Sequence, residues 1–264
     1  MRQLLSIEWI KVRKLNATWI IILVYLVLLP LWMLAMNLWF TEINKQVNLF
    51  PTTKVLWSFP GVWRFVSYSG SWFNILFSVI IVILTTNEFT NRTMRQHIID
   101  GQSKQKVILS KFIVVLGFSV FVTLYTFLIG FFFGISQSES IDLYTNIHYI
   151  FLFFLQTLCY FGFAFFLSIL IKKPALSILL YIGIIFVEAI AGFMLPRIIY
   201  AFMPMNNISL LTPLPFFNGI VTKMNKDRGE SNFSLETWQV ILISASICLF
   251  FYVFAYLRLK KRDL

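Results

Sequence analysis

The sequence predicts an all-α integral membrane protein with six transmembrane helices and both termini in the cytoplasm. Three observations support this fold class. Of the 264 residues, 59% are hydrophobic and only 12% are charged, whereas a soluble domain carries about a quarter charged residues. Six apolar runs interrupt the chain at intervals, and Lys and Arg are distributed unequally among the connections between them.

The six apolar runs define the expected spans. A helix needs about 20 mostly apolar residues to cross the hydrocarbon core of a bilayer. Lipid offers the backbone no hydrogen-bond partners, and these runs lack the alternation of barrel strands, so we expect helices. The whole chain, residues 1–264, is then a single transmembrane domain with spans at about 17–39, 72–86, 112–134, 147–171, 175–195 and 238–257.

The basic residues predict how these spans are oriented. Connections on the side of the N-terminus carry 15 Lys and Arg residues, and connections on the opposite side carry 7. Cytoplasmic connections are enriched in Lys and Arg. Residues 1–16 are therefore expected to form a cytoplasmic interfacial helix, and residues 87–111 a cytoplasmic loop. This topology explains the net charge of +11 without a nucleic-acid partner.

Both long outer connections contain apolar residues. In residues 42–71, side chains such as Trp57, Trp63 and Tyr68 predict an interfacial segment at the level of the lipid headgroups. Residues 197–236 begin with an apolar stretch that contains three prolines. We expect an outer loop there with short re-entrant helices, whose backbone must be covered by protein.

The cytoplasmic connection 87–111 is longer than a link between two spans needs to be. Thr93–Ile99 reads as a short helix that stops near Asp100 and Gly101, and Ser103 reads as the N-cap of the next helix. A solvated basic loop fits the spacing equally well. Farther along, Pro174 is expected to begin the fifth span.

Glu188 is the one acidic residue well inside an expected span. A carboxylate at the centre of a bilayer costs about 2.5–3.5 kcal/mol on insertion scales, so it normally faces protein or a wet cavity. Glu188 therefore belongs either to a substrate path or subunit interface, or to a local structural hydrogen-bond arrangement, and the sequence favours neither.

Gly130 and Gly134 form a small-xxx-small pair, a spacing that permits close helix contact, although chance explains it equally well. Cys159 and Cys248 lie in apolar runs and are expected to be buried, inert thiols. Neither His97 nor His148 belongs to a cluster with metal-ligand or catalytic spacing. We expect no metal site and no enzymatic activity.

Around the cytoplasmic loop the sequence resembles the type-2 class of ABC transporter permeases. Glu88, Thr93, the turn at residues 100–103 and Lys111 match the family's pattern between its second and third spans. The N-terminal segment Glu8-Trp-Ile-Lys11-Val-Arg13 is similar to the helix that precedes the family's first span. The layout of six spans, with a long outer loop before the last, matches as well.

The resemblance implies a type-2 ABC exporter (type V) transmembrane-domain architecture in the inner (cytoplasmic) membrane of a prokaryote. Two such permeases, as a homodimer or heterodimer surrounded by membrane lipid, would pair with two ABC ATPase subunits. The chain has no G-x-x-x-x-G-K-[ST] loop, so ATP and Mg²⁺ would bind to the ATPase, and this chain would hold no cofactor and be non-catalytic. It would move substrate outward.

The resemblance also implies which residues contact the ATPase. Met94, Ile98 and Ile99 would supply apolar contacts. Polar contacts, or support of the loop, would come from Glu88, Thr93, Arg95 and Asp100. Two alternatives stay open, a membrane anchor or assembly subunit of a secretion or motility machine, and a secondary carrier. A carrier would more often show internal repeats and several intramembrane charges.

Overall fold

The computed structural model describes residues 2–47, 54–91, 93, 96, 102–138, 142–215 and 235–261. Within these ranges the chain is helical and contains no strand, which confirms the all-α prediction. The helices are α1 (Arg2–Lys14), α2 (Asn16–Val47), α3 (Lys54–Trp57), α4 (Gly61–Trp72), α5 (Asn74–Thr90), α7 (Lys104–Gln137), α8 (His148–Ile171), α9 (Pro174–Met194), α10 (Arg197–Ala201), α11 (Pro204–Ser209) and α13 (Thr237–Lys261).

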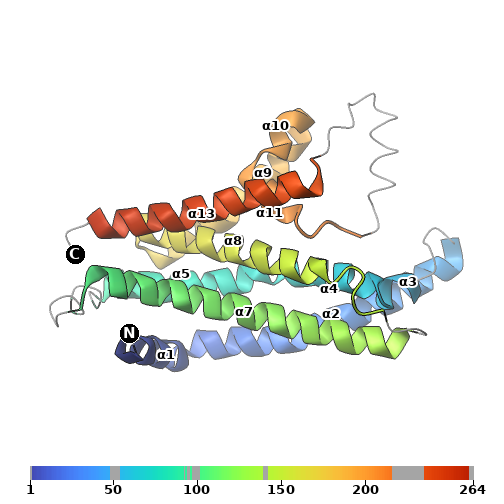
Figure 1. Ribbon diagram of the computed structural model, residues 1–264, viewed down its shortest axis with the longest axis horizontal. Helices are drawn as coiled ribbons and strands as arrows, with labels where there is room; N and C mark the ends of the chain where they lie inside the picture. The colour runs from blue at the N-terminus through green and yellow to red at the C-terminus, as the bar shows by residue number, and fades with distance from the viewer. Residues whose placement is uncertain are drawn as a thin grey trace.

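Five helices of the described chain, α2, α7, α8, α9 and α13, are long and apolar enough to cross a membrane. The helices α4 and α5 form a sixth candidate span with a bend of 42°. The long helices lie roughly side by side (Figure 1). The protein is therefore an all-helical membrane protein with five or six candidate spans.

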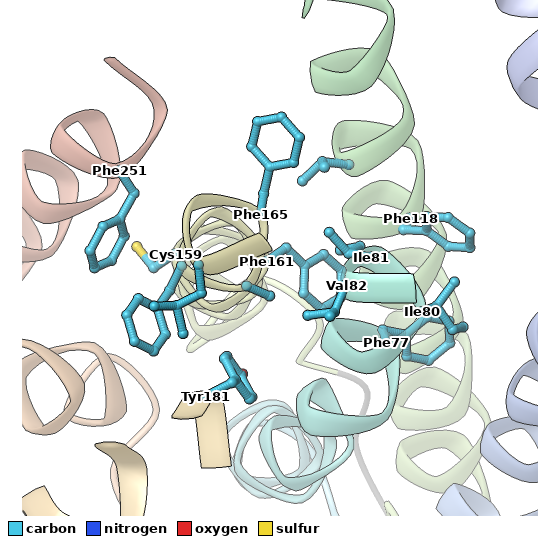
Figure 2. Close-up of a cluster of buried hydrophobic side chains, with 14 of the residues drawn as sticks. Phe77, Ile80, Ile81, Val82, Phe118, Cys159, Phe161, Phe165, Tyr181 and Phe251 are labelled. Carbon is cyan, nitrogen blue, oxygen red and sulfur yellow. The ribbon is translucent and has the colours of Figure 1, made fainter. Parts of the chain in front are cut away.

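Helix α8 is the centre of the bundle. It packs against α13, α5, α7, α4 and α9, and buried residues face several of these neighbours. In Figure 2, Phe161 of α8 points toward Ile81 and Val82 of α5, whereas Cys159 lies on the side of Phe251 of α13. All five side chains are at most 6% exposed. Apolar residues on every side of α8 thus reflect burial in protein rather than contact with lipid.

A second apolar cluster lies within residues 54–66 and its neighbours. Trp57, Trp63 and Phe65 are at most 2% exposed, so these aromatic side chains pack within the protein. Trp63 stacks on Phe127 of α7 with ring centroids 5.2 Å apart, and its Nε1 donates to the Leu143 carbonyl. The aromatic composition that favours a membrane interface serves equally well in a helix packed on the bundle.

The pair Gly130 and Gly134 lies where α7 meets the segment around α4. A Cβ atom at Gly130 would lie 2.8 Å from Cγ1 of Val66, and one at Gly134 would enter the ring of Phe59. Only glycine permits this approach. Close helix contact is confirmed for Gly130, which faces α4, whereas Gly134 faces Phe59 in the turn before α4.

Helix α2 touches the bundle along a narrow line. Tyr25 is fully buried, and its hydroxyl lies 2.7 Å from Oγ1 of Thr126 on α7. Most other large side chains of α2 are exposed, as are those of α9. Exposed apolar patches of this extent indicate contact with lipid or another membrane protein.

Helix α1 and the end of α13 lie at the same end of the bundle (Figure 1). This is the arrangement that an even number of spans requires. At this end α7 begins directly after Ser103, and α9 begins at Pro174, so both helix starts that the sequence indicates are confirmed. The side chain of Ser103 makes no capping hydrogen bond.

Candidate functional site

Four charged side chains meet at the end of the bundle where α1 lies. Glu8 and Lys11 are three residues apart on α1 and therefore share a face of that helix. Glu88 is near the end of α5, and Lys111 is in the third turn of α7. We call Glu8, Lys11, Glu88 and Lys111 the four-charge network.

Each lysine contacts both carboxylates. Nζ of Lys111 donates to Oε1 of Glu8 at 2.6 Å and to Oε1 of Glu88. Nζ of Lys11 donates to Oε1 of Glu88 at 2.7 Å and to Oε1 of Glu8 at 3.3 Å. These four side chains carry two positive and two negative charges.

The network is largely removed from solvent. Glu8, Glu88 and Lys111 are 6%, 3% and 5% exposed, respectively. Isolated charges at such depth would cost several kcal/mol each, and this cost is offset only when partners are well placed. Because every member has a partner of opposite charge, removing one member would leave its partners under-compensated.

The pKa of Lys11 reflects two opposing effects, the burial of its amine and the nearby carboxylates. Burial alone would lower the pKa of this amine, but the charges and hydrogen bonds of Glu88 and Glu8 outweigh it and raise the pKa above 10.5. The protonated form of Lys11 is thus favoured by folding.

The network joins three helices around one connection. Glu88 precedes the segment from Arg92 to Gly101 and Lys111 follows it, so the two ends of the connection are tied to each other. Both are also tied to α1, which leads directly into α2. Any force applied to the connection would be transmitted to α1, α5 and α7 together, because separating these buried partners is costly.

The other residues of the expected ATPase contact are only partly described. Of these residues, Thr93 is helical and half-buried. Gln96, which is not among the expected contact residues, is helical and exposed in the same segment. Met94, Arg95, Ile98, Ile99 and Asp100 lie outside the described residues.

Glu188 contacts a short helix of the connection between α9 and α13. Its Oε2 accepts hydrogen bonds from the backbone N–H groups of Met205 at 2.8 Å and Asn206 at 3.1 Å. These donors belong to the first turn of α11, where helix N–H groups have no partner within the helix. The geometry supports the structural alternative for Glu188, in which it anchors α11 to α9.

The helices α10 and α11 occupy the apolar first half of residues 197–236, where short helices are expected. Helix α11 packs on α13, α8 and α9, so protein covers it. Within the described part of the chain, no three His, Cys, Asp or Glu side chains gather into a group able to hold a metal ion.

A family model described as "Protein of unknown function (DUF2705)" matches residues 33–264. No functionally curated protein matches the chain. The match includes Glu88 and Lys111 of the four-charge network and begins after Glu8 and Lys11, within α2. Since it spans most of the chain, the protein belongs to the DUF2705 family.

Proposed function

We propose that this chain is the transmembrane permease subunit of an ATP-binding cassette exporter, driven by a separate ATPase. The four-charge network is the observation that carries the proposal. Three parts of the pattern that resembles the permease family, namely Glu88, Lys111 and the segment with Glu8 and Lys11, converge on one buried site, although up to 103 residues separate them along the chain.

The convergence gives the connection 87–111 a mechanical role. An ATPase that pushes on this connection would move the spans only if the connection were held firmly to them. Buried ion pairs that bind both of its ends to α1 supply that attachment. ATP and Mg²⁺ would bind to the ATPase, and this chain would transmit the motion without catalysing a reaction.

The proposal is tested by replacing the apolar residues expected to face the ATPase. The double variant Ile98→Glu/Ile99→Glu should lose the ATPase during copurification, because two carboxylates would have to be desolvated in the contact. The matched control Ile98→Leu/Ile99→Leu keeps an apolar surface of similar volume and should retain the ATPase.

Unchanged ATPase recovery and unchanged ATP hydrolysis in the double glutamate variant would contradict the proposal. Purification of the unmodified chain without any nucleotide-binding subunit would favour a secondary carrier. An associated ATPase together with components of a larger machine would favour the anchor or assembly role.

A further inference from the structure

A cavity of about 420 Å³ lies beside the bend between α4 and α5. Its volume falls in the range of 300–1,000 Å³ typical of small-molecule sites. The wall is formed by α4, α5, α8 and α9, and by the residues at the end of α11 and just beyond it. The lining residues are Tyr68, Ser71, Trp72, Asn74, Ile75, Gln156, Tyr160, Tyr181, Ile185, Ser209, Leu210, Thr212, Pro213 and Leu214.

Asn74 is a residue of this wall whose side chain is incompletely hydrogen-bonded. It is the first residue of α5 and is 1% exposed. Its Oδ1 lies 3.3 Å from Oγ1 of Thr157, whereas its Nδ2 has no hydrogen-bond partner. Turning the amide over would place Nδ2 near Thr157 and would still leave one N–H hydrogen unused. A buried N–H group without an acceptor costs about 1–3 kcal/mol.

The other side-chain amide of the wall and its Ser and Thr hydroxyls make hydrogen bonds within the protein. Nε2 of Gln156 donates to the Ile208 carbonyl, and Oε1 of Gln156 accepts from Oγ1 of Thr212. The hydroxyl groups of Ser71 and Ser209 donate to backbone carbonyls. Asn74 is therefore the amide of this wall whose nitrogen has no hydrogen-bond partner among the described residues.

The other residues of the cavity wall disfavour a charged ligand. Of the described residues that line the cavity, none is Lys, Arg, His, Asp or Glu. An ionised ligand would have to be buried without a counter-charge, which is strongly unfavourable. The apolar and aromatic residues of the wall, such as Trp72, Ile75 and Ile185, instead favour an apolar body.

We propose that this cavity binds an uncharged, largely apolar molecule whose hydrogen-bond acceptor, such as an ester or amide carbonyl, pairs with Nδ2 of Asn74. The inference rests on the cavity and on Asn74 and does not depend on coupling to an ATPase. Two sources share this chemistry, a neutral lipid of the surrounding bilayer and a neutral amphipathic cargo.

The test uses a monoacylglycerol with a diazirine in its acyl chain, applied to the full chain in lipid nanodiscs. After photolysis and digestion, labels located by mass spectrometry should fall within residues 68–75, 156–160, 181–185 and 209–214. An alkyl diazirine of the same chain length without polar groups should label these segments more weakly, because it cannot pair with Asn74.

Two variants separate the hydrogen bond from the cavity itself. Asn74→Leu should raise the probe concentration needed for half-maximal labelling about tenfold, the loss expected for one hydrogen bond. Ile75→Trp should abolish labelling by filling the space. The control Asn37→Leu makes the same exchange on α2 and should leave labelling unchanged. Gel filtration and Tm show whether each variant is folded.

Absence of label from these segments in the unmodified chain would overturn the proposal. Equal labelling of folded Asn74→Leu and of the unmodified chain would also overturn it, because the hydrogen bond from Asn74 would then contribute nothing to binding. Solvent extracts of the purified protein then distinguish the sources: an enriched neutral lipid that Ile75→Trp lacks identifies a bilayer ligand, whereas probe binding without one identifies a diffusible cargo. Neither measurement requires an ATPase, so this inference and the proposed function fail separately.

Discussion

At the scale of single residues, the side chains of the four-charge network stabilise one another, because each contacts partners of opposite charge. Lys111 is 5% exposed and contacts the carboxylates of both Glu8 and Glu88. Replacing a whole buried ion pair by apolar groups can be neutral, whereas removing one partner is costly because a charge remains without its counter-charge. The consequences of substitution therefore depend on which partners are left.

Lys111→Met should destabilise the protein by about 3–5 kcal/mol, the range for breaking a buried ion pair. Adding Glu88→Gln should recover part of this loss, since it neutralises one of the two carboxylates that then have Lys11 alone as their shared partner. Thermal unfolding in detergent measures both effects. Lys106→Met is the matched control, because Lys106 is an exposed lysine of the same helix. Equal Tm values for the two methionine variants would contradict the network.

The raised pKa of Lys11 predicts an alkaline loss of stability. A lysine whose folded pKa exceeds 10.5 holds its proton more tightly when folded. Its stabilising contribution is present below the unfolded pKa and is lost as the pH rises through the folded pKa. Lys11→Arg should reduce the fall in Tm between pH 10 and pH 12, because arginine keeps its charge there. Lys14→Arg, at an exposed position, should leave that fall unchanged.

At the scale of elements, glycine determines how closely α7 approaches its neighbours. The two glycines that face Phe59 and Val66 leave no room for a methyl group, whereas nothing lies within 4 Å of a Cβ placed at Gly117. These three glycines of one helix therefore provide an internal comparison between a tight contact and open space.

Gly130→Ala and Gly134→Ala should each destabilise the protein by about 1–3 kcal/mol, because an added methyl group in a close-packed contact forces neighbouring side chains to move. Gly117→Ala should be neutral or slightly stabilising, since alanine favours a helix and meets no obstacle. Thermal unfolding of the three variants, compared with the unmodified chain, measures these effects as changes in Tm. A Gly117→Ala variant as unstable as Gly134→Ala would contradict the role of close contact, because nothing near Gly117 obstructs the added methyl group.

Some elements could be predicted from sequence and others could not. The starts of α7 and α9 follow from local rules at Ser103 and Pro174, which depend only on neighbouring residues. The burial of Trp57 and Trp63 could not be predicted, because an aromatic residue suits a packed helix and a headgroup layer equally. The bend at Phe73 also lacks a sequence signal, since no proline or glycine stands at that position.

At the scale of the whole molecule, long-range contacts define both candidate sites. The resemblance to type-2 permeases draws attention to Glu88 and Lys111, but no local pattern predicts that they meet Glu8, which is 103 residues from Lys111. The cavity around Asn74 is likewise formed by segments far apart in the chain. Contacts between such distant segments depend on how the spans pack against one another. Charge counts and hydropathy do not determine that packing.

The arrangement of the bundle agrees with the expected topology. Helix α1 and the end of α13 lie at one end (Figure 1), and the end of α7 and the start of α8 lie at the other. The excess of Lys and Arg in the first group predicts that this end faces the cytoplasm. An ATPase is expected to approach the molecule there.

The central claim, that the connection between α5 and α7 binds an ATPase, is tested most directly by site-specific photocrosslinking in the native cell. A photoreactive residue at Gln96, which is exposed, is compared with one at Tyr144, which is 87% exposed at the opposite end. The account predicts that Gln96 crosslinks to a polypeptide with a G-x-x-x-x-G-K-[ST] loop and that Tyr144 does not. Crosslinks from Gln96 that contain no such ATPase, or equal capture of the ATPase from both positions, would contradict it.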